Sequence, residues 1–295
     1  MVEKKSLGER IFDKINIVLM LLIIAITVYP VYYVVVCSLS DGNQLMNMRG
    51  LILAPQGLNF AAYASVVDNP NIFSGYTVTL IVVVIGTILS VLLTAIGAFL
   101  ITRKGFPLAK PLSYLMVFTM YFSGGMIPTF IIVNNVLDLG DNLLALILPG
   151  VISVYNLLIM RSNFEALPRS LEEAAEIDGA NDIIVLFRII LPLSKSIIAV
   201  MVLFYAVTYW NAWFEAMLYI RDKELYPLQL VLREILMAND MTSMGDAGGA
   251  VQDRYMIGET IKYATIVIAT LPILCLYPFI QRYFVKGVMV GAVKG

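Results

Sequence analysis

Long stretches without any charged side chain are the feature of this sequence that most constrains its fold. Six of them lack Asp, Glu, Lys and Arg altogether: 15–40, 69–102, 111–137, 142–160, 196–214 and 263–281. About 20 apolar residues in a helix cross the roughly 30 Å hydrocarbon core of a bilayer. Because backbone inside lipid must satisfy its own hydrogen bonds, each stretch is expected to be helical. The sequence therefore predicts an all-α polytopic membrane protein with six transmembrane helices.

The composition also limits the chemistry. Only 14% of the 295 residues are charged, and there is no histidine. His-based catalysis is therefore excluded, along with the commonest transition-metal ligand. Proton- and sodium-coupled carriers usually keep a carboxylate inside the membrane, whereas the six stretches have none. A G-x-x-x-x-G-K-[ST] loop for ATP phosphates is also absent. If this protein moves a solute uphill, the energy must come from another polypeptide.

The distribution of basic residues predicts the orientation. Lys and Arg gather before the first stretch, between the second and third, between the fourth and fifth, and after the sixth. Basic loops stay in the cytoplasm, so both termini are expected there. The expected divisions are a cytoplasmic segment 1–14, a six-helix membrane domain 15–280 and a cytoplasmic tail 281–295. The domain would include a cytoplasmic loop 163–194 and a large external loop 215–262.

The cytoplasmic loop is strongly acidic for such an apolar chain. Five carboxylates lie within positions 172–182: Glu172, Glu173, Glu176, Asp178 and Asp182. Ser170 is suited to cap a helix, and Glu173, three residues on, would complete a capping box. Gly179 can end that helix in a left-handed conformation. A second helix is expected to start near Asn181 or Asp182. The pattern predicts a short helix on a fixed turn at the cytoplasmic face.

Seven residues of this loop, at fixed spacing, resemble the signature loop of ABC-importer permeases. They are Glu173-Ala174-Ala175, then Gly179 after three residues, Ile189 after nine more, and Leu191-Pro192 after one more. The likeness extends over nearly the whole chain. The stretches YFSGGMIPTFIIVNN, LYPLQLVLREIL and QRYFVKGVMVGAVKG are similar to the carbohydrate branch, in particular to permeases for oligosaccharides and plant-polysaccharide fragments.

The resemblance implies a type I ABC importer permease fold in a bacterial cytoplasmic membrane. In that family the loop is a coupling helix that docks on a cytoplasmic ATPase. The partners would be a second homologous permease, an ATPase dimer and an extracellular binding protein. The chain itself would be no enzyme and hold no cofactor or metal, since the ATPase binds ATP and Mg. The implied ATPase-coupling residues are Glu173, Ala174, Ala175, Asp178, Gly179, Ile189, Leu191 and Pro192.

Aromatic and polar side chains in the apolar stretches are candidates for the substrate pathway. Tyr205, Tyr209 and Trp213 are spaced to stack along one helix face, and sugars pack their rings on aromatics. Trp210, Asn211, Asn156 and Tyr121 are further candidates. The alternative for the aromatics is a belt at the membrane interface. Breaks are expected at Gly124-Gly125 with Pro128, at Pro149-Gly150 and at Pro272, either as kinks or as the interrupted helices of a transport site.

The external loop offers a contact surface. An amphipathic helix is predicted from Leu228, Val231, Leu232, Ile235 and Leu236. A small, glycine-rich stretch follows it, which in similar permeases contacts the binding protein. The candidate contacts are Met244, Gly245, Asp246, Gly248 and Gly249.

Three other functions compete with a sugar permease. The same machinery could import another solute, such as a polyamine or a peptide. A membrane-embedded glycan or lipid transferase would need Asp, Glu or His clustered at the membrane boundary, and the acidic residues here lie in the coupling loop or scatter through the external loop. A proton-coupled carrier is disfavoured by the uncharged stretches.

Overall fold

The computed structural model describes residues 6–48, 50–103, 105–244, 260–275 and 278. In these residues every regular element is a helix, apart from one isolated antiparallel bridge between Ser40 and Leu58. The all-α class predicted from the sequence is confirmed for them. They form two compact units, one from Met1–Asn69 with Glu234–Thr270 and one from Pro70–Arg233 with Leu271–Gly295.

The N-terminal part of the first unit consists of a long apolar helix and a small cap at its C-terminal end. Its helices are α1 (Leu7–Ser38), α2 (Gly42–Asn47) and α3 (Ala61–Val67). A small core of Val36, Cys37, Leu45 and Ile52 joins α1 to the cap. The cap is also fixed by polar contacts, since the Asp41 side chain accepts the first free N–H groups of α2.

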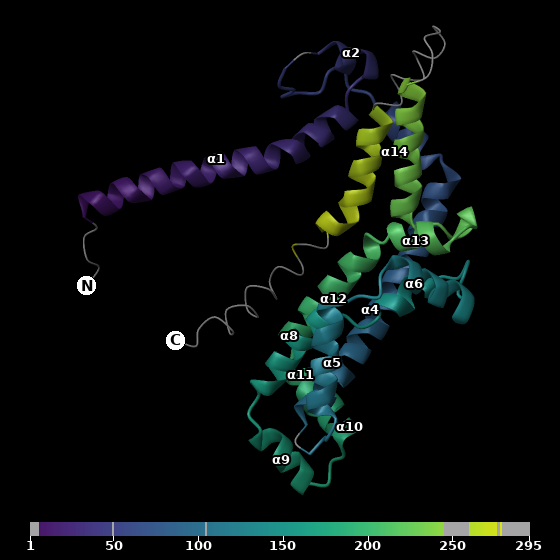
Figure 1. The fold of residues 1–295 in the computed structure, drawn as a ribbon. Coiled ribbons are helices and arrows are strands. Elements are labelled where there is room, and N and C mark those ends of the chain that lie inside the picture. Colours follow the sequence, from purple (N-terminus) through teal and green to yellow (C-terminus); the bar gives the residue numbers. More distant parts are fainter. Residues whose placement is uncertain (1–5, 49, 104, 245–259, 276–277, 279–295) are drawn as a thin grey trace. The chain divides into compact units, whose positions relative to one another are not determined.

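The second unit carries most of the chain and is built around α4 (Pro70–Thr102), which packs against α8 and α12 (Figure 1). The remaining elements after α4 are α5 (Ala109–Tyr121), α6 (Met126–Ile131), η1 (Ile132–Val136), α7 (Leu144–Ile147), η2 (Leu148–Gly150), α8 (Val154–Glu165), α9 (Ser170–Ile177), α10 (Asp182–Ile184), η3 (Val185–Ile190), α11 (Leu191–Leu193), α12 (Lys195–Trp210), α13 (Phe214–Tyr219), η4 (Lys223–Leu225) and α14 (Leu228–Met244), which continues into the other unit. A last apolar helix covers Thr260–Cys275.

Among the residues that the structure describes, two unbroken helices, α1 and α4, are long and apolar enough to cross a membrane alone. Three further candidates are bent pairs: Ala109–Tyr121 with Met126–Val136 at 112°, Leu144–Gly150 with Val154–Glu165 at 53°, and Asp182–Leu193 with Lys195–Trp210 at 87°. The expected breaks at Gly124-Gly125 and at Pro149-Gly150 are confirmed. Helix α5 ends at Tyr121, where Phe122 turns to an extended conformation. Gly125, with a φ of 89°, is the residue before α6. Pro272, by contrast, lies within the helix Thr260–Cys275.

The amphipathic helix predicted after residue 227 is α14. Leu228, Val231 and Leu232 are buried, and the Leu228 backbone N–H donates to the Thr79 hydroxyl of α4 at 2.8 Å. Gly75 allows this close approach, because a Cβ there would lie 3.1 Å from the Leu228 Cα. The helix is therefore fastened to α4 at its first turn.

Asp141 joins the turn after η1 to the loop 215–262, which is predicted to be external. It has a φ of 57°, and its carboxylate accepts the backbone N–H groups of Arg221 and Asp222. These bonds lower the pKa of the Asp141 carboxyl below its usual value. The turn between η1 and α7 is thereby tied to the turn before η4.

Candidate functional site: the coupling segment and two cavities

Residues 163–194, named the coupling segment after the role that the resemblance implies, contain a helix that ends as the sequence predicts. Gly179 follows α9 with a φ of 83°. The Ala180 N–H donates to the Ala175 carbonyl at 2.9 Å, and the Gly179 N–H donates to the Glu176 carbonyl at 3.0 Å. These two bonds form a Schellman motif, which satisfies the last carbonyls of the helix. The left-handed glycine predicted at this turn is confirmed.

The start of α9 differs from the prediction, and the capping box at Ser170 and Glu173 is wrong. The chain is already helical at Arg169, with φ −61° and ψ −27°. Ser170 is consequently the first residue inside the helix, and no side chain caps its N-terminus. The Arg169 carbonyl accepts from the N–H groups of Glu172 and Glu173, both at 3.0 Å.

The second arm of the coupling segment starts at Asn181, as predicted. The Asn181 side chain caps α10 by accepting the Ile184 N–H at 2.9 Å. The chain then widens into the π-helix η3, whose residues Val185, Leu186 and Ile190 are buried in the main core of this unit. The arm is thus anchored by apolar packing before it bends at Ser194 into α12.

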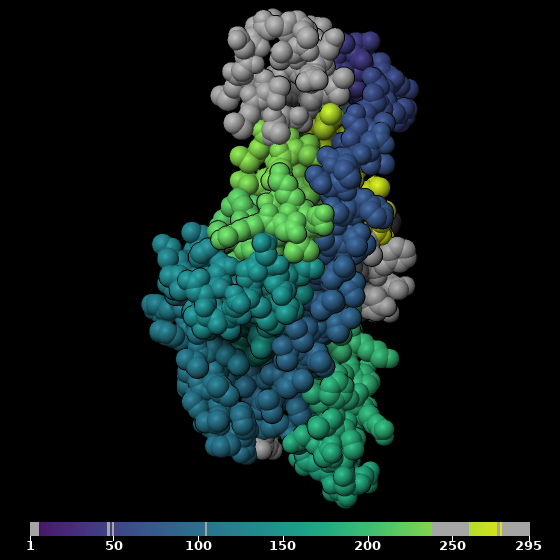
Figure 2. Space-filling model, turned by 90° about the vertical axis from the view of Figure 1, so that its right-hand side faces the viewer, coloured from purple at the N-terminus to yellow at the C-terminus, as the bar shows by residue number. Residues whose placement is uncertain are grey.

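The tip of the segment faces outward. Ile177 is 86% exposed, which is unusual for a large aliphatic side chain, and Asp178 beside it is exposed too. A Cβ on Gly179 would meet no atom within 4 Å. The segment projects from one end of its unit (Figures 1 and 2). Of the other predicted coupling residues, Glu173, Ala174 and Pro192 are exposed, whereas Ala175, Ile189 and Leu191 are half-buried.

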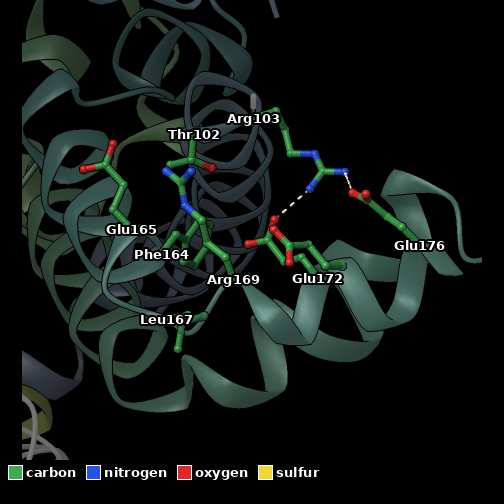
Figure 3. Close-up of a pocket in the computed structure, with 9 residues that line it drawn as sticks. Thr102, Arg103, Phe164, Glu165, Leu167, Arg169, Glu172 and Glu176 are labelled. Atoms are coloured by element: carbon green, nitrogen blue, oxygen red, sulfur yellow. Dashed lines mark hydrogen bonds and ion pairs between the residues drawn. The ribbon is translucent and has the colours of Figure 1, made fainter. Parts of the chain in front are cut away.

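Arg103, at the C-terminal end of α4, contacts both arms of the segment. Its guanidinium pairs with Glu172 at 2.7 Å and with Glu176 at 2.6 Å (Figure 3). It also pairs with Asp182. Burial lowers the pKa of Arg103, but the hydrogen bond to Glu176 and the other carboxylate contacts outweigh it, so the net shift is upward. A cavity of about 140 Å³ lies beside this cluster and includes Glu173 and Arg169 in its wall.

In the sequence Arg103 is one of the basic residues between the second and third apolar stretches, and its contact with the coupling segment was not predicted. Its partners lie 69 to 79 residues away. The available signal was the surplus of carboxylates in the segment, which needs a cation from another element.

Two cavities lie beside α12. The larger, about 730 Å³, is bordered by the breaks between α5 and α6 and between η2 and α8. Its polar wall includes Thr129, Thr208, Tyr209, Asn211 and Glu215. The other, about 620 Å³, is lined by Ser153, Asn156 and Tyr205 among others. Gly150, Val207 and Thr208 border both. Of the predicted pathway residues, Tyr209 and Asn211 therefore line one cavity and Asn156 and Tyr205 the other.

The two tyrosines are held by hydroxyl groups of α4. The Tyr209 hydroxyl bonds with that of Ser90 at 2.8 Å, and the Tyr205 hydroxyl bonds with that of Thr94 at 2.6 Å. Ser90 and Thr94 belong to a stripe of small buried residues at every fourth position, which begins with Gly86 and ends with Ala98. Such a stripe allows close helix packing in membranes, and it was the sequence signal for this contact.

The predicted aromatic stack on one helix face is wrong for Trp213. Helix α12 ends at Trp210, where the Asn211 amide turns back to the Val207 carbonyl, so Trp213 lies beyond the helix. Its ring packs instead under the Arg233 guanidinium, 4.5 Å from the centroid. Trp210 is buried edge-on to Tyr76. Trp210, Trp213 and the exposed Tyr121 line neither cavity.

The predicted binding-protein contacts are largely beyond the described residues. Met244 is the last residue of α14. Gly245, Asp246, Gly248 and Gly249 lie outside the described residues.

We predict that Gly86→Ala destabilises the protein and disturbs Tyr209. A Cβ at Gly86 would lie 2.7 Å from Tyr209 Cε2 and 2.8 Å from its Cζ, so the ring must move. Overpacking of this kind costs about 1–3 kcal/mol. The measurement is the thermal unfolding temperature of the purified protein in detergent. The matched control is Gly97→Ala in the same helix, whose Cβ meets only a Leu157 methyl below 3 Å. Equal unfolding temperatures for the two variants would contradict the assigned packing.

Comparison with known proteins agrees with this architecture. Residues 94–290 match the family described as binding-protein-dependent transport system inner membrane component. The polygalacturonan/rhamnogalacturonan transport system permease protein YtcP of Bacillus subtilis is 41% identical over 97% of this chain and 99% of its own length. Protein LplC of the same organism is also 41% identical, over 97% of this chain and 96% of its own.

A solved structure shares the fold. It is the crystal structure of a bacterial ABC transporter involved in the import of the acidic polysaccharide alginate. One of its chains is 29% identical with a TM-score of 0.86, covering 96% of this chain and 100% of that one. With apolar helices, a family match over most of its length and two close relatives, this chain belongs to the binding-protein-dependent transport system inner membrane components.

Proposed function

We propose that this chain is a permease subunit of a binding-protein-dependent ABC importer and forms half of the membrane pathway for an oligosaccharide. The observation that carries the proposal is the 41% identity, over 97% of the chain, to a permease named for polygalacturonan and rhamnogalacturonan transport. The alginate importer chain, with the same fold at 29% identity, supports the same class of substrate.

The proposed topology has six crossings, with both termini in the cytoplasm. The crossings are α1, α4, α5 with α6 and η1, α7 and η2 with α8, α12, and the helix that begins at Thr260. The bent pairs support it because broken helices are tolerated in membranes where they line a cavity. The basic residues that follow α4, and those in and beside the coupling segment, support the orientation. The two turns that Asp141 joins then lie on the external side.

The energy is proposed to come from a partner ATPase dimer that binds ATP and Mg, so this chain is not an enzyme. The coupling segment is the proposed docking element, because its tip offers Ile177, Asp178 and the open Gly179 to a partner. A second permease subunit completes the pathway. An external binding protein is proposed to touch the stretch that follows α14, and the tail 281–295 to reach the ATPase.

The larger cavity is suited to a sugar. Its hydroxyl, amide and carboxylate groups can pair with sugar hydroxyls, and the edge of Tyr209 supplies apolar surface. Broken helices on two sides bring backbone at Gly125 and Gly150 to the cavity wall, as in other transport sites.

The decisive experiment is purification of the complex from cells that express the complete system. ATP hydrolysis in proteoliposomes is then measured with the binding protein loaded with oligogalacturonides, neutral oligosaccharides, a peptide or a polyamine. Stimulation and uptake with an oligosaccharide are expected. Stimulation only by the peptide or the polyamine would favour a non-sugar importer. A chain that purifies without an ATPase and transfers glycans or lipids would be the alternative enzyme.

We predict that Asn211→Ala reduces uptake. Asn211 is exposed to the larger cavity, and its carbonyl oxygen can accept from a sugar hydroxyl. The loss of one hydrogen bond of about 1 kcal/mol corresponds to about a fivefold change. The measurement is the initial rate of labelled oligosaccharide uptake at a subsaturating concentration. The control is Thr119→Ala on α5, which lines neither cavity. Wild-type uptake from the Asn211 variant would exclude this cavity wall from the pathway.

A further inference from the structure

The two arms of the coupling segment are attached to the rest of their unit in different ways. The second arm is held by apolar burial, since Val185, Leu186 and Ile190 belong to the main core. Helix α9, by contrast, has no buried residue at all. Only Ala175 packs partly against the core, with Ala180 just after the helix. The position of α9 therefore depends on its polar contacts.

Arg103 supplies those contacts. It pairs with Glu172 and Glu176 on α9 and with Asp182 on the second arm, so one side chain bridges both sides of the Gly179 turn. Its side chain is only 18% exposed, which limits screening by water and salt. Its guanidinium also stacks on the Phe99 ring, 5.1 Å from the centroid. The planar guanidinium of Arg103 is held by the Phe99 ring and by three carboxylates, so these carboxylates have little freedom to move independently of α4.

Helix α4 leads from Arg103 to the cavities. Two turns from its C-terminal end, Thr94 bonds with Tyr205, and one turn further Ser90 bonds with Tyr209. Tyr205 and Tyr209 each line one of the two cavities. A rigid helix with close-packed neighbours transmits a displacement of its end to these side chains.

We infer that Arg103 is a positioning residue that ties α9 to α4, so that movement of the coupling segment reaches the cavity walls through α4 as well as through α12. This inference rests on the proposed function, because it assigns Arg103 to the coupling of ATP hydrolysis to import. The coupling segment is joined to α12 by continuous backbone. Its connection to α4 depends on the side-chain contacts of Arg103, so one substitution can remove it.

The first test compares import with hydrolysis in the intact complex. Arg103→Gln should hydrolyse ATP but import about fivefold less sugar per ATP, within the range by which single residues change coupling. Arg103→Lys keeps the positive charge but lacks the planar guanidinium. Its ratio of imported sugar to hydrolysed ATP should therefore lie between those of Arg103→Gln and the wild type. The matched control is Arg161→Gln, which removes an ion pair of α8 with Glu165 on the same side of the membrane. This control should keep the wild-type ratio.

A second test asks whether Arg103 acts through the three carboxylates. The triple variant Glu172→Gln, Glu176→Gln, Asp182→Asn should lower the ratio as Arg103→Gln does. Adding Arg103→Gln to the triple variant should then change nothing more, because residues that share one network are not additive. Independent, additive losses would overturn the inference.

A third test reads the attachment of α9 without any transport. Spin labels are placed at Ile177→Cys on α9 or Ile183→Cys on α10, in the full chain with the exposed Cys275 replaced by Ser; Cys37 is buried. Arg103→Gln should raise nitroxide mobility at position 177 and have much less effect at 183. If Arg103→Gln leaves the nitroxide mobility at position 177 unchanged, the inference is overturned. It is also overturned if the mobility rises while the variant imports as much sugar per ATP as the wild type. A wild-type complex without sugar-stimulated hydrolysis would instead contradict the proposed function, and the spectra would still decide whether Arg103 holds α9.

Discussion

Gly179→Val is expected to leave the protein folded and inserted in the membrane while uptake falls by about an order of magnitude. The φ of 83° at this residue penalises any side chain by roughly 1–2 kcal/mol. A strain of that size shifts an equilibrium by a factor of about 5–30. Nothing in the described part of the chain lies within 4 Å of the added Cβ, so no core is overpacked. The strain therefore acts on the turn between the two arms, at the surface proposed to dock on the ATPase.

The measurement is uptake and ATP hydrolysis by the purified variant, together with the amount of ATPase that remains bound. The control is Gly50→Val, which has a φ of 114° and equally open surroundings but lies in a different unit. Gly50→Val should import normally, and Gly179→Asn should be milder than Gly179→Val because Asn tolerates this conformation. Normal uptake by Gly179→Val would refute the coupling role of this turn.

Ile177→Asp is expected to detach the ATPase. Since Ile177 is 86% exposed, the substitution leaves the fold of this chain unchanged. Full burial of an isoleucine against a partner is worth about 1.5–3 kcal/mol, and every 1.4 kcal/mol is about tenfold in affinity. A carboxylate placed in an apolar groove costs still more. The amount of co-purified ATPase should therefore fall more than about tenfold.

The matched control for that experiment is Leu51→Asp. Leu51 is 73% exposed and lies in the cap of the first unit. It should retain the ATPase at the wild-type level. Full retention in Ile177→Asp as well would show that the exposed isoleucine is not part of the docking surface.

The local features of the coupling segment could be predicted from the sequence, whereas the contacts that hold it could not. Gly179 and Asn181 act on backbone groups within a few residues, so their neighbours reveal them. The capping box failed because the chain enters α9 one residue early, and a spacing motif does not encode the backbone angles of Arg169. Arg103 and the Ser90 and Thr94 hydroxyls pair with residues distant in sequence, which one sequence alone does not identify.

In the apolar helices, too, the sequence predicts the local structure but not the way in which the helices are arranged. Stretches without charge predict apolar helices because lipid excludes charge, and α1 and α4 agree with that expectation. The same criterion cannot distinguish a straight helix from one that turns back, since glycine and proline cause either a kink or a break. The 112° angle after α5 spans a break that contains the extended Phe122 and the positive φ of Gly125. The composition of the stretch does not reveal that angle.

The hydroxyl bonds between α4 and α12 have a consequence for biosynthesis. Ser90 and Tyr209 are 119 residues apart, and Thr94 and Tyr205 are 111 apart. At about 5–20 residues per second, a ribosome needs roughly 6–24 seconds to reach the tyrosines after it has made the hydroxyls. During that time α4 is in the bilayer with its small stripe uncovered, and Ser90 and Thr94 can only bond back to their own helix. In the proposed topology the fifth crossing thus completes the second, and a nascent chain that stops before α12 leaves the hydroxyls of Ser90 and Thr94 without their tyrosine partners, which membrane quality control can recognise.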